Sequence, residues 1–274
     1  MKYIIGISGG VDSCYVLYKC KQQHLDAVAV TFDNGWDNPI AKENVRRMID
    51  YTGYQHKVYS CDLTEFREIQ RAFLLSGTPH AECPTDVAVG KTLLMAKKEF
   101  GANRIITGHN RNEGTITNPD WSVVDGLYVK SVVKRHGRIK LKTFPNMNLW
   151  DHVQIKKVWC LLDDYEYDTN QAKKVLIDKF GWQPYGNKHY ESIFTKFNQG
   201  LRYYRHGIDM RLVDNNPEYD LTKPPMSLVE FHKLLDIVCR ELDLNPGQIM
   251  SAPHSDWRSY ASYRKWIKRI RKVI

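Results

Sequence analysis

Short apolar runs alternate with amphipathic stretches through the first hundred residues of the chain. The apolar runs have the length of buried strands, and they fall at residues 2–7, 27–32, 55–60 and 103–107. Apolar side chains between these runs recur at helical spacing, which predicts helices at residues 11–23, 40–51, 64–75 and 84–100. The pattern therefore predicts strands that alternate with helices, with two helices between the third and fourth strands.

This succession is typical of βαβ units, because parallel strands need a crossover that returns the chain to the same end of the sheet. We therefore predict an α/β fold built on a doubly wound parallel sheet. Right-handed crossovers place the carboxyl ends of the strands along one edge. Ligands bind at that edge in open sheets of this kind.

The pattern changes in the second half of the chain. A basic patch at residues 130–142 is followed by further helical periodicity, which predicts helices at residues 149–162, 170–180, 192–205 and 227–242. We therefore divide the chain into an α/β nucleotide domain at 1–117 and a mostly helical substrate-binding region at 118–274, packed on the first domain.

Composition adds limits to this picture. Apolar residues make up 42% and charged residues 26%, as in ordinary globular proteins. No apolar run approaches the roughly 18 residues that span a bilayer. The first strand leads directly into a glycine turn without a cleavage signal, so we expect a cytoplasmic protein. Six cysteines without a CxxC pair favour reduced thiols over a disulfide framework or a zinc site.

The net charge of +9 indicates an acidic partner, such as a nucleotide, a nucleotide sugar, a nucleic acid or a membrane surface. Much of the excess lies at residues 257–274, where cations and aromatic residues are interleaved. This tail has the composition of a segment that binds nucleic acid or lies on a membrane. Helical spacing favours a third interpretation, a C-terminal helix that packs Tyr260, Tyr263, Trp266, Ile267 and Ile270 into the core.

The strongest chemical signal is the sequence SGGVDS at residues 8–13, directly after the first predicted strand. Gly9 and Gly10 allow a tight turn, and the backbone N–H groups at the following helix start can hold an anion. Ser8 and Ser13 add hydroxyl donors, while Asp12 can hold Mg²⁺ bound to phosphates. The alternative is a glycine turn with an ordinary Ser/Asp helix cap.

SGGVDS resembles the signature of the N-type ATP pyrophosphatases, the PP-loop superfamily with the HUP-type fold of adenine nucleotide α-hydrolases. The resemblance continues in VTFDNGW at 30–36 and ITGHNRNE at 106–113, both at predicted strand ends. It implies ATP and Mg²⁺ as cofactors. It also implies nucleotide contacts from the loop and from five further residues, namely Thr31, Phe32, Asp33, Gly108 and His109. Asp33 has an alternative role as a turn residue.

A finer resemblance extends over most of the chain. TFDNGW, PTD at 84–86, KLKTFP at 140–145 and the segment at 181–200 are similar to the N-acetyl sugar amidotransferases. This implies that ATP adenylates the N-acetyl oxygen of a nucleotide-linked sugar, PPi leaves, and ammonia displaces AMP to form an amidine. It also implies a glutaminase partner and a cyclase-like subunit that supply ammonia.

The implied chemistry needs charge neutralisation at the departing pyrophosphate. We assign Asp12 and Glu113 as metal ligands, and these two together with Ser13 and Lys188 as catalytic residues. Glu113 has an alternative role as a helix-start carboxylate. Further along the chain, Lys188 is part of a polar cluster with His189, Tyr190 and Glu191, which is either substrate-facing or a solvated loop.

Lys140 and Lys142 flank Leu141 as on a half-buried strand, so both face one side. They would contact the diphosphate of a sugar nucleotide or simply face water. Cys83 supports a rival function, a PP-loop enzyme that modifies tRNA or DNA bases and carries sulfur on this thiol. A third hypothesis is a nucleotide-binding module without catalysis.

Overall fold

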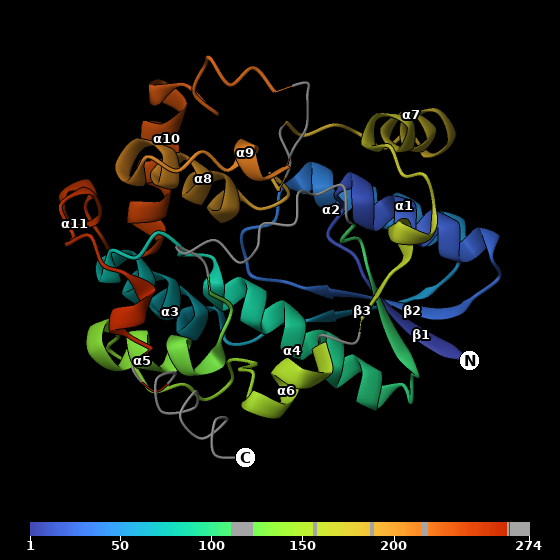
Figure 1. The fold of residues 1–274 in the computed structure, drawn as a ribbon, viewed down its shortest axis with the longest axis horizontal. Helices are drawn as coiled ribbons and strands as arrows, with labels where there is room; N and C mark the ends of the chain where they lie inside the picture. Colours follow the sequence, from blue (N-terminus) through green and yellow to red (C-terminus); the bar gives the residue numbers. More distant parts are fainter. Residues whose placement is uncertain (111–122, 156–157, 187–188, 215–218, 262, 264–274) are drawn as a thin grey trace.

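The computed structural model describes residues 1–110, 123–155, 158–186, 189–214, 219–261 and 263 (Figure 1). Five parallel strands form one sheet in the order β3-β2-β1-β4-β5. The strands are β1 (Lys2–Gly6), β2 (Asp26–Phe32), β3 (Gln55–Tyr59), β4 (Arg104–Thr107) and β5 (Trp159–Cys160). The order reverses at β1, so the predicted doubly wound parallel sheet is confirmed, with β1 at its centre.

Helices cover both faces of the sheet, and successive β1 residues show why. Ile5 packs in one buried cluster with Leu17 of α1 (Val11–Gln22) and Met48 of α2 (Pro39–Thr52). Ile4 points to the opposite face and packs with Leu93 of α4 (Cys83–Glu99). The two-residue period of a strand buried on both sides thus fixes the two layers. Helix α7 (Thr169–Phe180) joins the α1 and α2 layer (Figure 1).

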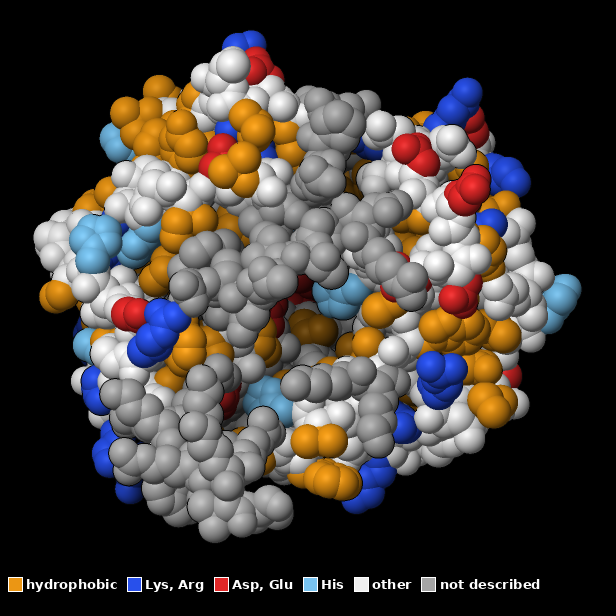
Figure 2. All heavy atoms as spheres, in the orientation of Figure 1, with side chains coloured by type: hydrophobic (Ala, Val, Ile, Leu, Met, Phe, Trp, Pro, Cys, Tyr) orange, Lys and Arg blue, Asp and Glu red, His pale blue; other side chains and the backbone are white. Residues whose placement is uncertain are grey.

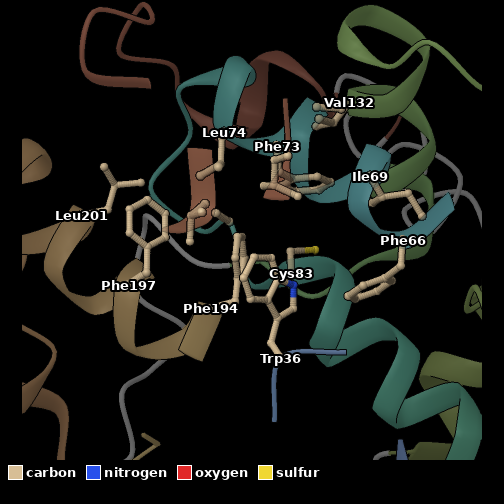
Figure 3. Close-up of a cluster of buried hydrophobic side chains, with 14 of the residues drawn as sticks. Trp36, Phe66, Ile69, Phe73, Leu74, Cys83, Val132, Phe194, Phe197 and Leu201 are labelled. Atoms are coloured by element: carbon tan, nitrogen blue, oxygen red, sulfur yellow. The ribbon is translucent and has the colours of Figure 1, made fainter. Parts of the chain in front are cut away.

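Most of the remaining helices form a lobe beside the sheet. It contains α3 (Leu63–Ser76), α5 (Gly126–His136), α8 (Ile193–His206), α9 (Arg211–Asp214), α10 (Leu228–Glu241) and α11 (Pro246–Met250), with a short 3-10 turn at η2 (Trp257–Ser259). Helix α6 (Leu149–Ile155) packs on α4, and the 3-10 turn η1 (Leu161–Asp164) follows β5 and packs in the cluster beneath α1 and α2. The centre of the lobe is an aromatic core in which Phe73 of α3 and Phe194 and Phe197 of α8 are fully buried (Figure 3). This core joins residues from both halves of the sequence.

Side-chain caps and left-handed glycines set most helix ends that the sequence pattern predicted. Asn38 accepts from the backbone of Ile40 at the start of α2, and Asp62 caps α3 in the same way. Gly53 ends α2 at φ +65°, and Gly77 ends α3 at φ +67°. Because these signals are local, the predicted ends lie within a residue or two of the observed ones.

Two sequence predictions in the second half were wrong. The helix predicted at 149–162 ends at Ile155, and the chain then adds β5 beside β4. Residues 140–142 form a loop without strand pairing, because backbone N–H groups here bind a side chain of α3. Tertiary contacts override local periodicity at both places. The basic patch, for which the sequence predicted no element, overlaps helix α5, whose buried face comprises Tyr128, Val129, Val132 and Val133.

Two other predictions fall partly outside the described residues. The boundary at 117/118 lies outside the described residues, and the proposed division into two regions stays a prediction, although β5 of the second half joins the sheet. Of the predicted tail helix, Tyr260 is buried, as expected, and residues 264–274 lie outside the described part. No helix among the described residues is long and apolar enough to cross a membrane.

Candidate functional site

The loop at residues 8–13 follows β1 and turns directly into α1. The Ser8 backbone N–H donates to Ser13 Oγ at 3.2 Å, and the Ser13 hydroxyl donates to the Gly10 carbonyl at 3.1 Å. The Gly10 N–H donates to Ser8 Oγ at 3.4 Å. Both serines thus hold the turn open at the positive end of the α1 dipole, in the form of an anion-binding loop.

Glycine is required at position 9 for two reasons. Gly9 has φ +88°, and a Cβ placed there would lie 2.3 Å from the carbonyl oxygen of Ala41 in α2. The Gly9 carbonyl accepts from the indole Nε1 of Trp182 at 3.0 Å. Asn44 of α2 exchanges two hydrogen bonds with the backbone of Gln183, at 2.8 and 2.9 Å. The loop is therefore fixed between α2 and a segment of the second half.

Gly108 brings the end of β4 against the same loop. A Cβ at Gly108 would lie 3.0 Å from the Ser13 nitrogen and 3.1 Å from the Asp12 carbonyl carbon. Only glycine permits this approach without a shift of the backbone. The two glycine motifs that the sequence placed at separate strand ends are thus in direct contact. His109, the next residue, is exposed.

The end of β2 contributes a third side of the site. The Thr31 hydroxyl donates to the Ile7 carbonyl at 2.8 Å and lies 3.0 Å from His56 Nε2. The Phe32 ring packs on Phe66 in the core, so only its backbone is available to a ligand. Asp33 accepts from the Gly35 N–H at 2.7 Å, which is the turn role that the sequence left open.

Asp12 lies in the first turn of α1 and is held by a tyrosine from the second half. The Tyr167 hydroxyl donates to Asp12 Oδ1, and Tyr167 itself is buried. This bond fixes the carboxylate orientation before any ligand arrives. A carboxylate at a phosphate-binding loop is a suitable Mg²⁺ ligand, since Mg²⁺ bridges protein carboxylates and phosphate oxygens.

Glu191 reaches the loop through a short bridge between distant segments. Asp37 pairs with Ser192 in an isolated antiparallel bridge, and the Asn38 N–H donates to the Glu191 carbonyl at 2.8 Å. The Glu191 Oε1 atom lies 3.6 Å from where a Cβ on Gly10 would be. Sequence reasoning placed Glu191 among substrate residues; the bridge puts its carboxylate beside the phosphate loop.

The electrostatics of Glu191 are set by its surroundings. Burial acts to raise its pKa, but hydrogen bonds from His189 and Ser8 outweigh this and lower the pKa below its usual value. His189 Nδ1 lies 3.9 Å from Glu191 Oε1 and has φ +64°, an uncommon backbone state for a histidine. Glu191 is therefore ionised at neutral pH.

Asp12 and Glu191 are carboxylates beside the phosphate loop that could hold a magnesium ion. Burial is the largest cause that raises the pKa of the Tyr185 hydroxyl, and the negative charges of Glu191 and Asp12 raise it further. Glu191 Oε2 is buried and has no hydrogen-bond partner. Within the described ranges, no group of three or more His, Cys, Asp or Glu could hold a metal. Mg²⁺ in proteins is usually coordinated by one or two carboxylates, and phosphate oxygens and water complete its coordination.

The other predicted site residues divide into three groups. Glu113 and Lys188 lie outside the described residues. Tyr190 is buried against the lobe, with Lys196 Nζ 4.9 Å from its ring centre. Lys140 and Lys142 are exposed in a loop held by α3, which follows β3, and β2 separates β3 from β1. The Asp62 N–H donates to the Thr143 hydroxyl at 3.0 Å, so this loop lies near the carboxyl end of β3.

Cys83 does not have the environment of a sulfur carrier. It is fully buried in the aromatic core at the start of α4, between Trp36 and Phe66 (Figure 3). A reactive thiol needs access and a lowered pKa. Cys61 and Cys160 lie half-buried near the carboxyl ends of β3 and β5, and burial raises the pKa of the Cys61 thiol to about 11.

A parallel sheet with a glycine loop after its central strand and carboxylates beside it is the arrangement of α/β nucleotide-binding folds. Figure 2 shows a hollow near the centre of one face, with histidine and acidic side chains at its wall. The similar proteins are consistent with this class. No protein-family model matches the chain.

Curated relatives include two thiouridylases and one synthase. The tRNA-specific 2-thiouridylase MnmA 2 of Fusobacterium nucleatum is 22% identical over 203 residues, 67% of this chain and 57% of that protein. MnmA of Polaromonas is 27% identical over 133 residues, 42% of this chain and 33% of that protein. The 7-cyano-7-deazaguanine synthase of Psychromonas ingrahamii is 34% identical over 89 residues, 32% and 37% of the two chains. The chain thus spans less than two thirds of each relative.

Two solved structures resemble the fold at low scores. The U34-tRNA thiolase NcsA from Methanococcus maripaludis, with its [4Fe-4S] cluster, has a TM-score of 0.37 and 14% identity, covering 97% of this chain and 73% of that chain. The NMN synthetase from Francisella tularensis has a TM-score of 0.34 and 13% identity, covering 79% and 89%.

The relatives named here are PP-loop ATP pyrophosphatases, which use ATP with Mg²⁺. They support the superfamily resemblance of the phosphate loop and an enzyme of that class. They do not support the finer resemblance to sugar amidotransferases, and they favour the alternative of base modification.

Proposed function

We propose that this chain is an ATP-dependent enzyme that adenylates a carbonyl oxygen of a nucleobase in RNA. The observation that carries the proposal is the convergence of Asp12, Gly108 and Glu191 on the phosphate loop at the carboxyl edge of the sheet. Two of the relatives are named as tRNA-specific 2-thiouridylases, which supports RNA as the acceptor class. The net charge of +9 also suits a polyanionic substrate.

In the first step, the base carbonyl oxygen attacks the α-phosphorus of ATP and the bond to pyrophosphate breaks. The loop N–H groups and the hydroxyls of Ser8 and Ser13 hold the leaving pyrophosphate, because charge develops there. Mg²⁺, when bound by Asp12 and Glu191, neutralises part of that charge. Tyr167 keeps the Asp12 carboxylate oriented throughout.

In the second step, a sulfur or nitrogen nucleophile attacks the activated base carbon. The carbon–oxygen bond breaks, and AMP leaves with the original carbonyl oxygen. The burial of Cys83 argues for a nucleophile delivered from elsewhere, such as a partner protein or a small molecule. The adenylation step is common to thiolation and amidation.

The proposal is tested by following the fate of ATP with different acceptors. Purified chain, Mg²⁺ and ATP, with ammonium or sulfide as the nucleophile, are incubated with bulk tRNA, with the same tRNA after nuclease digestion, or with UDP-N-acetyl sugars. We expect AMP and PPi only with intact tRNA. Formation of ADP and phosphate would contradict adenylation. PPi release with the sugars and none with tRNA would replace the nucleobase by an N-acetyl sugar.

We predict that Asp12→Asn lowers tRNA-dependent PPi release at least 100-fold, since it removes a negative metal ligand and keeps the shape of the side chain. The melting temperature should change by only a few degrees. Asp26→Asn is the matched control, because Asp26 is exposed at the opposite end of the sheet. Full activity in Asp12→Asn would remove the loop carboxylate from the mechanism.

A further inference from the structure

A groove lies between the second half of α4 and helix α6, away from the phosphate loop. Its volume is about 490 Å³. One side carries apolar and basic residues of α4, and the other carries Asp151 and Gln154 of α6. The residues of α4 that line it are Lys91, Leu94, Met95, Lys97 and Lys98. At a rise of about 1.5 Å per residue, Lys97 and Lys98 lie about 20 Å along α4 from its start.

The groove presents positive charge to solvent. Lys91 pairs with Asp151 at 2.8 Å, and the same Asp151 oxygen accepts from the Asn148 N–H at 2.9 Å. Asp151 is thereby neutralised within the protein. Across the part of the chain that the structure describes, no ion pair includes Lys97 or Lys98. These two cations are available to an anionic ligand.

An exposed aromatic residue lies on α6, the helix that forms the other wall of the groove. Trp150 of α6 is 67% exposed, and it lies one helical turn before Gln154, which lines the groove. Met95 of α4 is 42% exposed on the other side. Figure 2 shows hydrophobic side chains over α6 next to Lys and Arg side chains, on the same face as the central hollow. The indole thus offers a flat apolar face on the helix that forms one wall of the groove.

We propose that this groove binds the sugar-phosphate backbone of the RNA substrate, with Trp150 stacking on an unpaired base. The inference rests on the proposed function and adds the docking surface to it. A concave, basic groove follows a chain-like polyanion, and a base presents a flat face to an indole. The separation of the groove from the phosphate loop suits a substrate long enough to contact both.

Two variants separate charge from stacking. Lys97→Glu/Lys98→Glu should weaken binding of fluorescent tRNA at least 10-fold in anisotropy titrations, and Trp150→Ala should weaken it about 10-fold. The lysine variant should also reduce the slope of log affinity against log salt by about 2. Lys173→Glu/Lys174→Glu on α7 is the control, because it makes the same charge change on another surface. Lys97→Gln/Lys98→Gln replaces the charge reversal if that variant does not fold.

The outcomes distinguish the docking surface from the function. We expect the groove variants to raise the KM for tRNA while kcat for PPi release at saturating tRNA stays within about twofold. If the groove variants bind tRNA as tightly as the wild type, or if the α7 control loses as much affinity as they do, the proposed groove is wrong. The proposed adenylation would not be affected by either result. A wild-type chain that binds no tRNA would instead overturn the RNA substrate and the groove together.

Discussion

Backbone conformation and close packing restrict the residue type at several positions of the site as strongly as the chemistry does. Gly9 must accept a left-handed backbone and the Ala41 carbonyl at once, and Gly108 must accept the start of α1. These packing demands on two residues come from two helices, α2 and α1. Asp12 and Ser13 then present their side chains from a loop whose position is already fixed.

A buried carboxyl group near the start of α4 has a pKa that its surroundings raise. Glu82 is buried beside Arg202, and its Oε1 atom has no hydrogen-bond partner. Burial, followed by the charge of Asp86, raises the pKa of Glu82 to about 7, although Arg202 acts in the opposite direction. In the unfolded chain the carboxyl ionises near its ordinary pKa of 4.5.

The sign of the pH dependence follows from this raised pKa. The folded state holds the proton of Glu82 between pH 4.5 and about 7, so its contribution to stability is fully present below pH 4.5 and is lost as pH rises through 7. We predict that Glu82→Gln increases the free energy of unfolding at pH 8 by roughly 1–3 kcal/mol and has little effect at pH 4.5.

Urea unfolding of both proteins at the two pH values measures this difference. Glu241→Gln, which changes an exposed carboxyl, serves as the control and should show no such dependence. A destabilised Glu82→Gln at pH 8 would mean that ionised Glu82 gains more from Arg202 than it loses by burial.

At the level of elements, a carboxylate of α3 binds the backbone N–H groups of the segment that the sequence predicted as a strand at 140–142. Glu65 accepts from the N–H groups of Lys142, Thr143 and Phe144 at 2.7 to 3.2 Å, and from the Thr143 hydroxyl at 2.8 Å. Burial acts to raise the pKa of Glu65, but these bonds together lower it below 4.5. A single side chain thus satisfies a whole turn of loop backbone.

We predict that Glu65→Gln lowers the free energy of unfolding by about 2–3 kcal/mol at pH 7, because one acceptor oxygen becomes a donor facing N–H groups. The ionised form contributes its stability above pH 4.5, and this is lost as pH falls through the lowered pKa. The difference between variant and wild type should therefore shrink in urea titrations below pH 4.5. Glu230→Gln, from an exposed ion pair, should cost under about 1 kcal/mol.

At the scale of the whole molecule, the hydrophobic clusters contain residues from both halves of the sequence. The aromatic core combines α3 and α4 of the first half with α8 and α10 of the second. The cluster beneath α1 and α2 likewise includes Leu176 of α7. Neither half can bury its apolar surface without the other.

We predict a single calorimetric unfolding transition for the chain. Phe194→Ala in the aromatic core and Leu17→Ala beneath α1 should each destabilise by about 2–5 kcal/mol and lower the same transition. Two transitions, with each variant lowering only one of them, would show that the halves fold independently.

The sequence by itself determined most of the α/β frame. Strands such as β1 and β2 are continuous apolar runs because both faces are covered, and the caps at Asn38 and Asp62 mark helix starts locally. It also indicated the phosphate loop, because two glycines between a buried strand and a helix allow an anion-binding turn. These features depend on neighbours in the chain.

Only the tertiary structure decided how the site is completed. Glu191 reaches the loop through the pairing of Asp37 with Ser192, and Tyr167 holds Asp12 across more than 150 residues. β5 is too short to be visible as a pattern and exists because β4 offers it an edge. The loop at 140–144 and the burial of Cys83 were likewise set by distant side chains. Contacts between remote segments leave no periodic trace, so their chemistry becomes visible only once the chain is folded.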